Sequence, residues 1–155
     1  MFKYFAILAA AISIICLQSV YAETCPKVSE IKKSHLTDWK AYDSDDGKPL
    51  SSARAEQFNR AVEAFVLAEW SDNTQKKGSI HCYYRDKSGS NLEAYLAKEN
   101  YHPKKLTHHF WYTVSGHMHC AASSKQCEFE SDIPTHRCKR QSNLQLGHRH
   151  DRARQ

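Results

Sequence analysis

The chain has 155 residues, with 22 lysines and arginines against 17 aspartates and glutamates, ten histidines and six cysteines. This length suits one ordinary domain and argues against two domains or a large cofactor-binding enzyme. A content of 41% apolar and 25% charged residues is that of an ordinary globular protein. Such a composition argues against a wholly disordered chain and against a fibrous repeat.

Residues 1–22 have the features of a secretory signal peptide. Lys3 gives a positive start, an apolar run extends from Phe5 to Cys16, and small residues lead to a cleavage site that we predict after Ala22. The apolar run is shorter than the roughly 20 residues that a membrane-spanning helix needs. We therefore predict a secreted or periplasmic protein with no transmembrane segment after cleavage. Residues 23–132 are expected to form its single domain.

Taken in chain order, the pattern of this domain predicts a turn, one short helix and several short strands. The aspartates and glycine of Asp43–Gly47 are typical of a tight turn. Helix-forming residues from Ala53 predict a short helix, which is followed by a strand that ends near Trp70. Further strands are expected at residues 79–85, 91–97, 110–114, 117–121 and 126–130. Because polar turns rather than long helical crossovers separate these strands, we predict an α+β fold that is mainly antiparallel β-sheet with one short helix.

Residues 133–155 differ from the preceding domain in charge and in apolar content. This segment holds six lysines and arginines and one aspartate, whereas residues 23–132 are close to neutral. Because it has few apolar side chains to bury, it is predicted to be a flexible basic tail, rich in histidine and arginine. Charge gathered in a tail favours contact with an anionic surface over specific binding of nucleic acid. The alternative is that the tail is a solvated extension that keeps the protein in solution. The candidate contact residues are Arg137, Lys139, Arg140, Arg149, Arg152 and Arg154.

Five cysteines are left in the chain once Cys16 is removed with the signal peptide. In an oxidising compartment we expect them to form disulfides, because no cytosolic reductant keeps them as thiols. Cys138 lies between basic residues and is the candidate for a free thiol or for a bond that links two chains into a dimer. Pairing of Cys138 within its own chain is an alternative, and the sequence does not choose the connectivity. The disulfide candidates are Cys25, Cys82, Cys120 and Cys127.

A group of histidines makes a metal site a second hypothesis. On a strand, His117 and His119 point to the same side and Cys120 points to the other side. With a third imidazole from His108 or His109, they have the ligand chemistry to bind zinc or copper. The alternative is that these histidines are ordinary exposed residues and that the protein has no cofactor.

No catalytic motif points to an enzyme. The patterns G-x-S-x-G and H-E-x-x-H do not occur. Serine, histidine and acidic residues are present, but a catalytic triad is defined by geometry and not by composition. The chain is therefore expected to be non-enzymatic, with a hydrolase whose site has no recognised motif as a lower-ranked alternative.

Neighbouring aromatic residues favour a binding protein. Tyr83 and Tyr84, like Trp111 and Tyr112, must point to opposite sides of a sheet. If one side of the sheet is uncovered, its aromatic side chains form a patch that a partner can contact. We predict that this partner is an unknown protein, a glycan or an anionic envelope surface. The alternative is that most of these rings are core residues.

Several short motifs give the chain a resemblance to a known family. The sequence resembles a family of small exported bacterial proteins of unknown function, which occurs in intracellular gammaproteobacteria of the Legionella and Coxiella type. The resemblance implies a β-rich fold and a secreted or periplasmic location, and it supplies no catalytic residues. The basic tail and Cys138 depart from the family pattern. The motifs are Thr24-Cys25-Pro26, Ala68-Glu69-Trp70, Cys82-Tyr83-Tyr84, Tyr95-Leu96-Ala97, the run from Trp111 to Gly116, His119-Cys120-Ala121-Ala122 and Gln126-Cys127-Glu128-Phe129.

Overall fold

The computed structural model describes residues 22–71 and 78–133 of the chain. The helices are α2 (Val28–Lys32), α3 (Ser52–Ala61) and the 3-10 helix η2 (Lys105–Phe110). The strands are β1 (Lys40–Asp43), β2 (Ala64–Ser71), β3 (Ser79–Arg85), β4 (Asn91–Glu99), β5 (Tyr101–Pro103), β6 (Tyr112–Val114), β7 (His117–Cys120) and β8 (Phe129–Ser131). The predicted α+β class with a mainly antiparallel sheet is confirmed.

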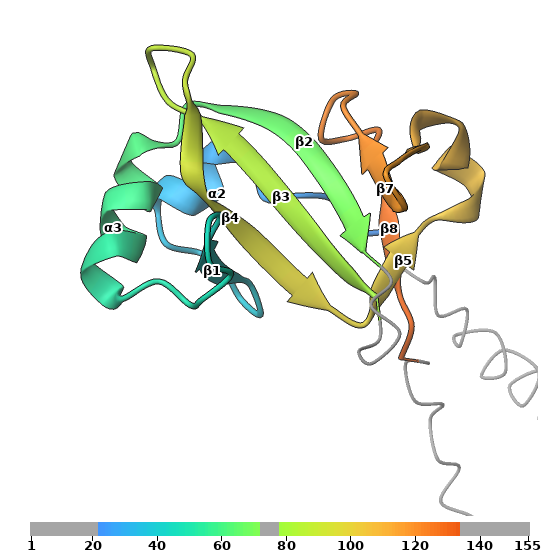
Figure 1. Ribbon diagram of the computed structural model, residues 1–155, viewed down its shortest axis with the longest axis horizontal. Helices are drawn as coiled ribbons and strands as arrows, with labels where there is room; N and C mark the ends of the chain where they lie inside the picture. Colours follow the sequence, from blue (N-terminus) through green and yellow to red (C-terminus); the bar gives the residue numbers. More distant parts are fainter. Residues whose placement is uncertain (1–21, 72–77, 134–155) are drawn as a thin grey trace, which may run out of the picture.

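Six strands form the main sheet, in the order β1-β4-β3-β2-β7-β6, and β5 pairs with β8 in a small second sheet. Every neighbouring pair of strands is antiparallel. In Figure 1, the long strands β2, β3 and β4 cross the middle of the molecule, with α3 at one end and β7 and β8 at the other. The pairs β1–β4 and β2–β7 join segments that are far apart in the sequence, so the sheet depends on non-local contacts.

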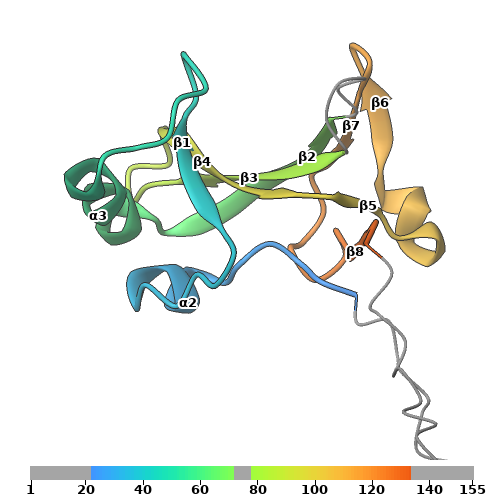
Figure 2. The same cartoon turned by 90° about the horizontal axis from the view of Figure 1, so that it is seen from below.

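The two faces of the main sheet have different surroundings. Along β3, Ile80, Cys82 and Tyr84 are fully buried, whereas the alternating residues Ser79, His81 and Tyr83 are only partly buried. Figure 2 shows α2, the N-terminal segment and β8 on one side of the sheet, while β1 and the β6–β7 hairpin rise on the other side. No described helix or strand covers that second side, which we call the concave face. The expectation that Tyr83 and Tyr84 lie on opposite sides is confirmed.

The core fills the space beneath the covered face. Phe129 of β8 is fully buried, and its ring meets those of Trp39 and Tyr101 edge to face, with centroids 6.0 and 5.6 Å apart. The buried hydroxyl of Tyr84 donates a hydrogen bond of 2.8 Å to the carbonyl oxygen of Pro26. The sheet is thereby packed against the N-terminal segment.

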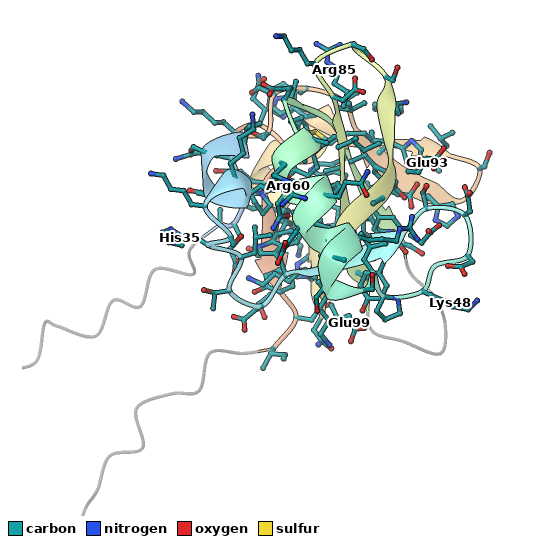
Figure 3. All side chains as sticks on the ribbon, turned by 90° about the vertical axis from the view of Figure 1, so that its left-hand side faces the viewer. His35, Lys48, Arg60, Arg85, Glu93 and Glu99 are labelled. Carbon is teal, nitrogen blue, oxygen red and sulfur yellow. A yellow bond between two sulfur atoms is a disulfide. The ribbon has the colours of Figure 1, made fainter. Side chains whose placement is uncertain are left out.

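At the α3 end, charged side chains such as those of Lys48, Arg60 and Glu93 are exposed and labelled in Figure 3.

Two disulfides hold the fold together. Cys25 bonds to Cys82, which ties the N-terminal segment to the middle of β3, and Cys120 bonds to Cys127, which closes the loop after β7. All four sulfur-bearing residues are buried. The four predicted disulfide candidates therefore pair with one another, whereas Cys138 lies outside the described residues.

The segment next to the predicted cleavage site is fixed in the fold. The backbone of Glu23 exchanges hydrogen bonds of 2.9 and 3.0 Å with that of Phe129. Its carboxylate contacts the ammonium of Lys98 and accepts a hydrogen bond of 2.6 Å from the hydroxyl of Tyr101. These contacts place the first residue of the predicted mature chain against the covered side of the sheet.

The tight turn and the helix are found where the sequence predicts them. Gly47 has φ +65°, and its N–H donates to the carbonyl oxygen of Asp43 at 3.1 Å. Ser51 caps α3 by accepting a hydrogen bond from the backbone N–H of Arg54. The expectation of one helix was wrong, however, because α2 is a second one. This helix has five residues, too few for a helical period to show in the sequence.

Two predicted strands differ from the structure. The strand expected at 110–114 is confined to β6, because only three of its residues face β7, and residues through Phe110 belong to η2. Ser115 and Gly116 both have positive φ and make the reversal into β7. The strand expected at 126–130 begins only at Phe129, because the N–H groups of Gln126 and Cys127 donate to the carbonyl oxygen of Ser123 in a turn.

We predict that the two disulfides contribute unequally to the free energy of unfolding. Replacing both Cys25 and Cys82 with alanine opens a loop of 57 residues and is expected to cost about 4 kcal/mol by the loop-entropy relation. Replacing both Cys120 and Cys127 opens a loop of seven and is expected to cost about 2 kcal/mol. Urea unfolding of the two double variants measures both values. Equal losses would contradict the prediction.

Candidate functional site

A line of polar side chains crosses the concave face at the centre of the sheet. Glu69 of β2 lies directly opposite His81 of β3 on one side and His119 of β7 on the other. The carboxylate oxygens Oε1 and Oε2 lie 3.4 Å from Nδ1 of His81 and 3.0 Å from Nε2 of His119. Nε2 of His81 is in turn 3.0 Å from the Oγ atom of Ser79. We call these four residues the polar row.

The polar row is shielded but still reaches solvent. The side chains of Glu69, His81 and His119 are each about one fifth exposed, at 19%, 20% and 19%. In such surroundings, charge interactions are less screened than on an open surface. The row is therefore accessible to a ligand and also has stronger electrostatic interactions than exposed side chains.

Beside the polar row lies a row of three tyrosines, Tyr42 of β1, Tyr95 of β4 and Tyr83 of β3, which we call the tyrosine row. The rings of Tyr42 and Tyr95 are stacked with centroids 5.7 Å apart, and those of Tyr95 and Tyr83 are 5.3 Å apart. The ring of Tyr95 also lies 4.7 Å from that of His81, which joins the two rows. The concave face thus combines aromatic rings with a carboxylate and imidazoles.

Strand register and one close backbone contact position the polar row. Ser79 and His81 are two residues apart on β3, so that their side chains share a face. Gly78 precedes Ser79 at a point where a Cβ atom would lie 2.9 Å from the carbonyl oxygen of Tyr101. The indole N–H of Trp70 donates to that same carbonyl oxygen at 2.8 Å. The start of β3 therefore requires glycine before the serine.

The polar row keeps its carboxylate charged and its neighbouring phenol neutral. A hydrogen bond from His81 lowers the pKa of Glu69, burial opposes this, and the charges of His81, His119 and His117 lower it further. Burial raises the pKa of Tyr83, and the nearby charge of Glu69 adds to the effect. At neutral pH the face therefore presents one carboxylate next to protonated hydroxyl groups.

The histidines predicted as metal ligands are only partly brought together. His117 and His119 share the concave side of β7, and they lie opposite Val114 and Tyr112 of β6. The ring of His109 packs on Phe110, with centroids 3.9 Å apart. His108 belongs to η2, but its side chain lies outside the described part. Among the residues whose side chains the structure describes, a set that leaves out His108, no group of three or more His, Cys, Asp or Glu side chains is placed to hold a metal ion.

Other predicted site residues lie beyond the described ranges. These are the signal peptide up to residue 21 and the candidate contact residues of the tail. The candidate functional residues that the sequence analysis missed are Ser79, His81 and Glu69. Alternation along residues 79–85 already places serine, histidine and tyrosine on one side, but only the pairing of β2 with β3 brings Glu69 to them.

Comparisons of this chain with protein-family models, with curated proteins and with solved structures found no match. The described helices include none with the length and apolar character needed to cross a membrane. The resemblance to the exported gammaproteobacterial family stays a prediction.

We predict that Glu69 makes part of the stability depend on pH. Its lowered pKa means that the unfolded chain binds more protons at this group, so the stabilisation is present above the ordinary value of 4.5 and is lost as pH falls through the lower folded value. Glu69→Gln is expected to lower the unfolding free energy at neutral pH and to flatten its decrease below about pH 4.5. Urea unfolding across this pH range measures both effects.

The matched control is Glu63→Gln, at an exposed glutamate whose carboxylate pairs with Lys32 on the surface. This change is expected to alter stability by no more than about 0.5 kcal/mol. A Glu69→Gln variant with the same acid sensitivity as the wild type would contradict the prediction.

Proposed function

We propose that this protein is an exported binding protein and that its ligand is a glycan held on the concave face. The observation that carries this proposal is the tyrosine row, in which three rings from three strands lie side by side on a face that no described helix or strand covers. The three rings are half-buried. Aromatic side chains that remain accessible on an uncovered face are typical of binding surfaces.

The chemistry beside the rings favours a glycan among the predicted partner classes. A tyrosine ring offers an apolar surface to the C–H side of a sugar, and its hydroxyl offers hydrogen bonds to the sugar's hydroxyl groups. Glu69, His81 and His119 add further acceptors and donors next to the rings. An anionic surface is a poorer match, because the negative charge of Glu69 lies in the middle of this face.

Export is part of the same proposal. Two buried disulfides suit an oxidising compartment, such as the periplasm or the cell exterior. The signal-like first 22 residues and the family resemblance point to the same location. A glycan of the bacterial envelope or of a host is accessible to a protein in that location.

A glycan array of bacterial-envelope and host oligosaccharides tests the proposal with the full mature chain. We expect binding to one glycan class that Tyr42→Ala and Tyr95→Ala each weaken by about tenfold, because each removes a stacking ring. The corresponding changes to phenylalanine keep the ring and separate stacking from hydrogen bonding. Titration calorimetry with the selected glycan measures these affinities.

The matched control is Tyr101→Phe, on the covered side of the sheet, where the hydroxyl donates to Glu23. This variant is expected to bind the glycan as the wild type does. Absence of binding to every glycan, or equal affinity in the wild type and both alanine variants, would contradict the proposal.

A zinc or copper site is the second candidate function. It is favoured by the common orientation of His117 and His119 on β7, next to the carboxylate of Glu69. If it exists, titration calorimetry with zinc shows stoichiometric uptake that is lost in the His117→Ala and His119→Ala variants. His35→Ala, at an exposed histidine near α2, is the control. Absence of uptake by the wild-type protein eliminates this candidate.

A further inference from the structure

Three side chains of the polar row have the connectivity of a nucleophile, a base and an orienting carboxylate. The Oγ atom of Ser79 lies 3.0 Å from Nε2 of His81, and Nδ1 of His81 lies 3.4 Å from Oε1 of Glu69. The serine and the carboxylate therefore contact opposite nitrogens of one imidazole. This is the arrangement in which a serine hydroxyl is activated by a histidine that an acid orients.

The carboxylate determines which nitrogen of His81 accepts the serine proton. The carboxylate oxygen Oε1 of Glu69 lies 3.4 Å from Nδ1 of His81, and this proximity favours a proton on the Nδ1 atom that faces it. In the neutral ring, Nε2 then carries the free lone pair. In this tautomer the hydroxyl of Ser79, whose Oγ atom lies 3.0 Å from Nε2, is the donor, which is the direction of proton transfer needed for nucleophilic attack.

The surroundings hold this arrangement in place. The ring of Tyr95 packs on that of His81, and His119 contacts the second carboxylate oxygen of Glu69 at 3.0 Å. Both contacts restrict the rotation of the base and of the acid. Ser79 itself is half-buried on the concave face.

We propose that Ser79 is the nucleophile of an acyl-transfer site, with His81 as the general base and Glu69 as the positioning residue, and that its substrates are carboxylic esters. The Oγ atom of Ser79 attacks the ester carbonyl carbon while its proton moves to Nε2 of His81. The bond from this carbon to the alcohol oxygen breaks, and the alcohol leaves with that proton. Water then attacks the acyl-serine, again through His81, and releases the carboxylic acid and free Ser79.

This activity goes beyond the binding function proposed above and does not depend on it. The nucleophile rests on contacts among Ser79, His81 and Glu69, whereas glycan binding rests on the tyrosine row. Labelling of Ser79 with no glycan binding, or the reverse, therefore separates the two proposals.

Reaction of the full mature chain with a fluorophosphonate tests the nucleophile directly. The serine oxygen forms a bond to phosphorus and fluoride leaves, so that labelling reports the reactivity of an activated serine. Peptide mass spectrometry is expected to place the label on Ser79 and to find none there in Ser79→Ala. His81→Ala and His81→Gln are expected to slow labelling by about 100-fold or more, because they remove the base. Near-ultraviolet circular dichroism verifies that each variant is folded.

The matched control is Ser88→Ala, at an exposed serine whose hydroxyl donates to the carboxylate of Asp86 and has no described contact with an imidazole. This variant is expected to label as fast as the wild type. The release of 4-nitrophenol from 4-nitrophenyl acetate is expected to fall in the same variants that label slowly.

The role of Glu69 has a separate readout. Nitrogen-15 NMR of the imidazoles is expected to show a proton on Nδ1 of His81 in the wild type and a loss of that preference in Glu69→Gln, together with slower labelling. The proposal is overturned if the folded wild type does not label at Ser79. It is equally overturned if both folded His81 variants label at the wild-type rate.

Discussion

The bond between Cys25 and Cys82 is the constraint on which the rest of the arrangement depends. It ties the N-terminal segment to the middle of the central strand β3. Two residues further along β3, the hydrogen bond from Tyr84 to Pro26 holds the same segment. That segment, with α2 and β8, therefore covers one face of the sheet (Figure 2). Because side chains of a strand alternate between faces, fixing Cys82 on the covered face directs His81 and Tyr83 to the concave face.

The concave face carries a half-buried carboxylate, that of Glu69. Partial burial of a carboxylate is unfavourable unless it is paired, and Glu69 has a histidine on the strand to each side of it. His81 also contacts Ser79, and its ring packs against that of Tyr95. One set of contacts thus stabilises the carboxylate and also creates the two features that the functional proposals use, an oriented imidazole and an adjoining aromatic surface.

The sequence predicted correctly those turns and strands whose conformation depends on residues within one short segment. The turn at Asp43–Gly47 depends on aspartate hydrogen bonds and a positive φ, and the strand at 79–85 was predicted with its observed limits. The strand predicted at 110–114 was too long, because its pairing ends with the three residues that β7 can face. The candidate site was predicted only in part. His119 was named as a metal ligand, and its contact with Glu69 was not foreseen.

The sequence by itself determined the strand-rich α+β class, the presence of five cysteines that an oxidising compartment allows to pair, and which residues of each strand share a side. These properties depend on residue type and on spacing within one segment. Only the tertiary structure decided the disulfide connectivity, the covered face, and the meeting of Ser79, His81, Glu69 and His119. The physical reason is that these contacts cross between β2, β3 and β7, and the register of strands that are distant in the chain is set by the packing of the whole sheet.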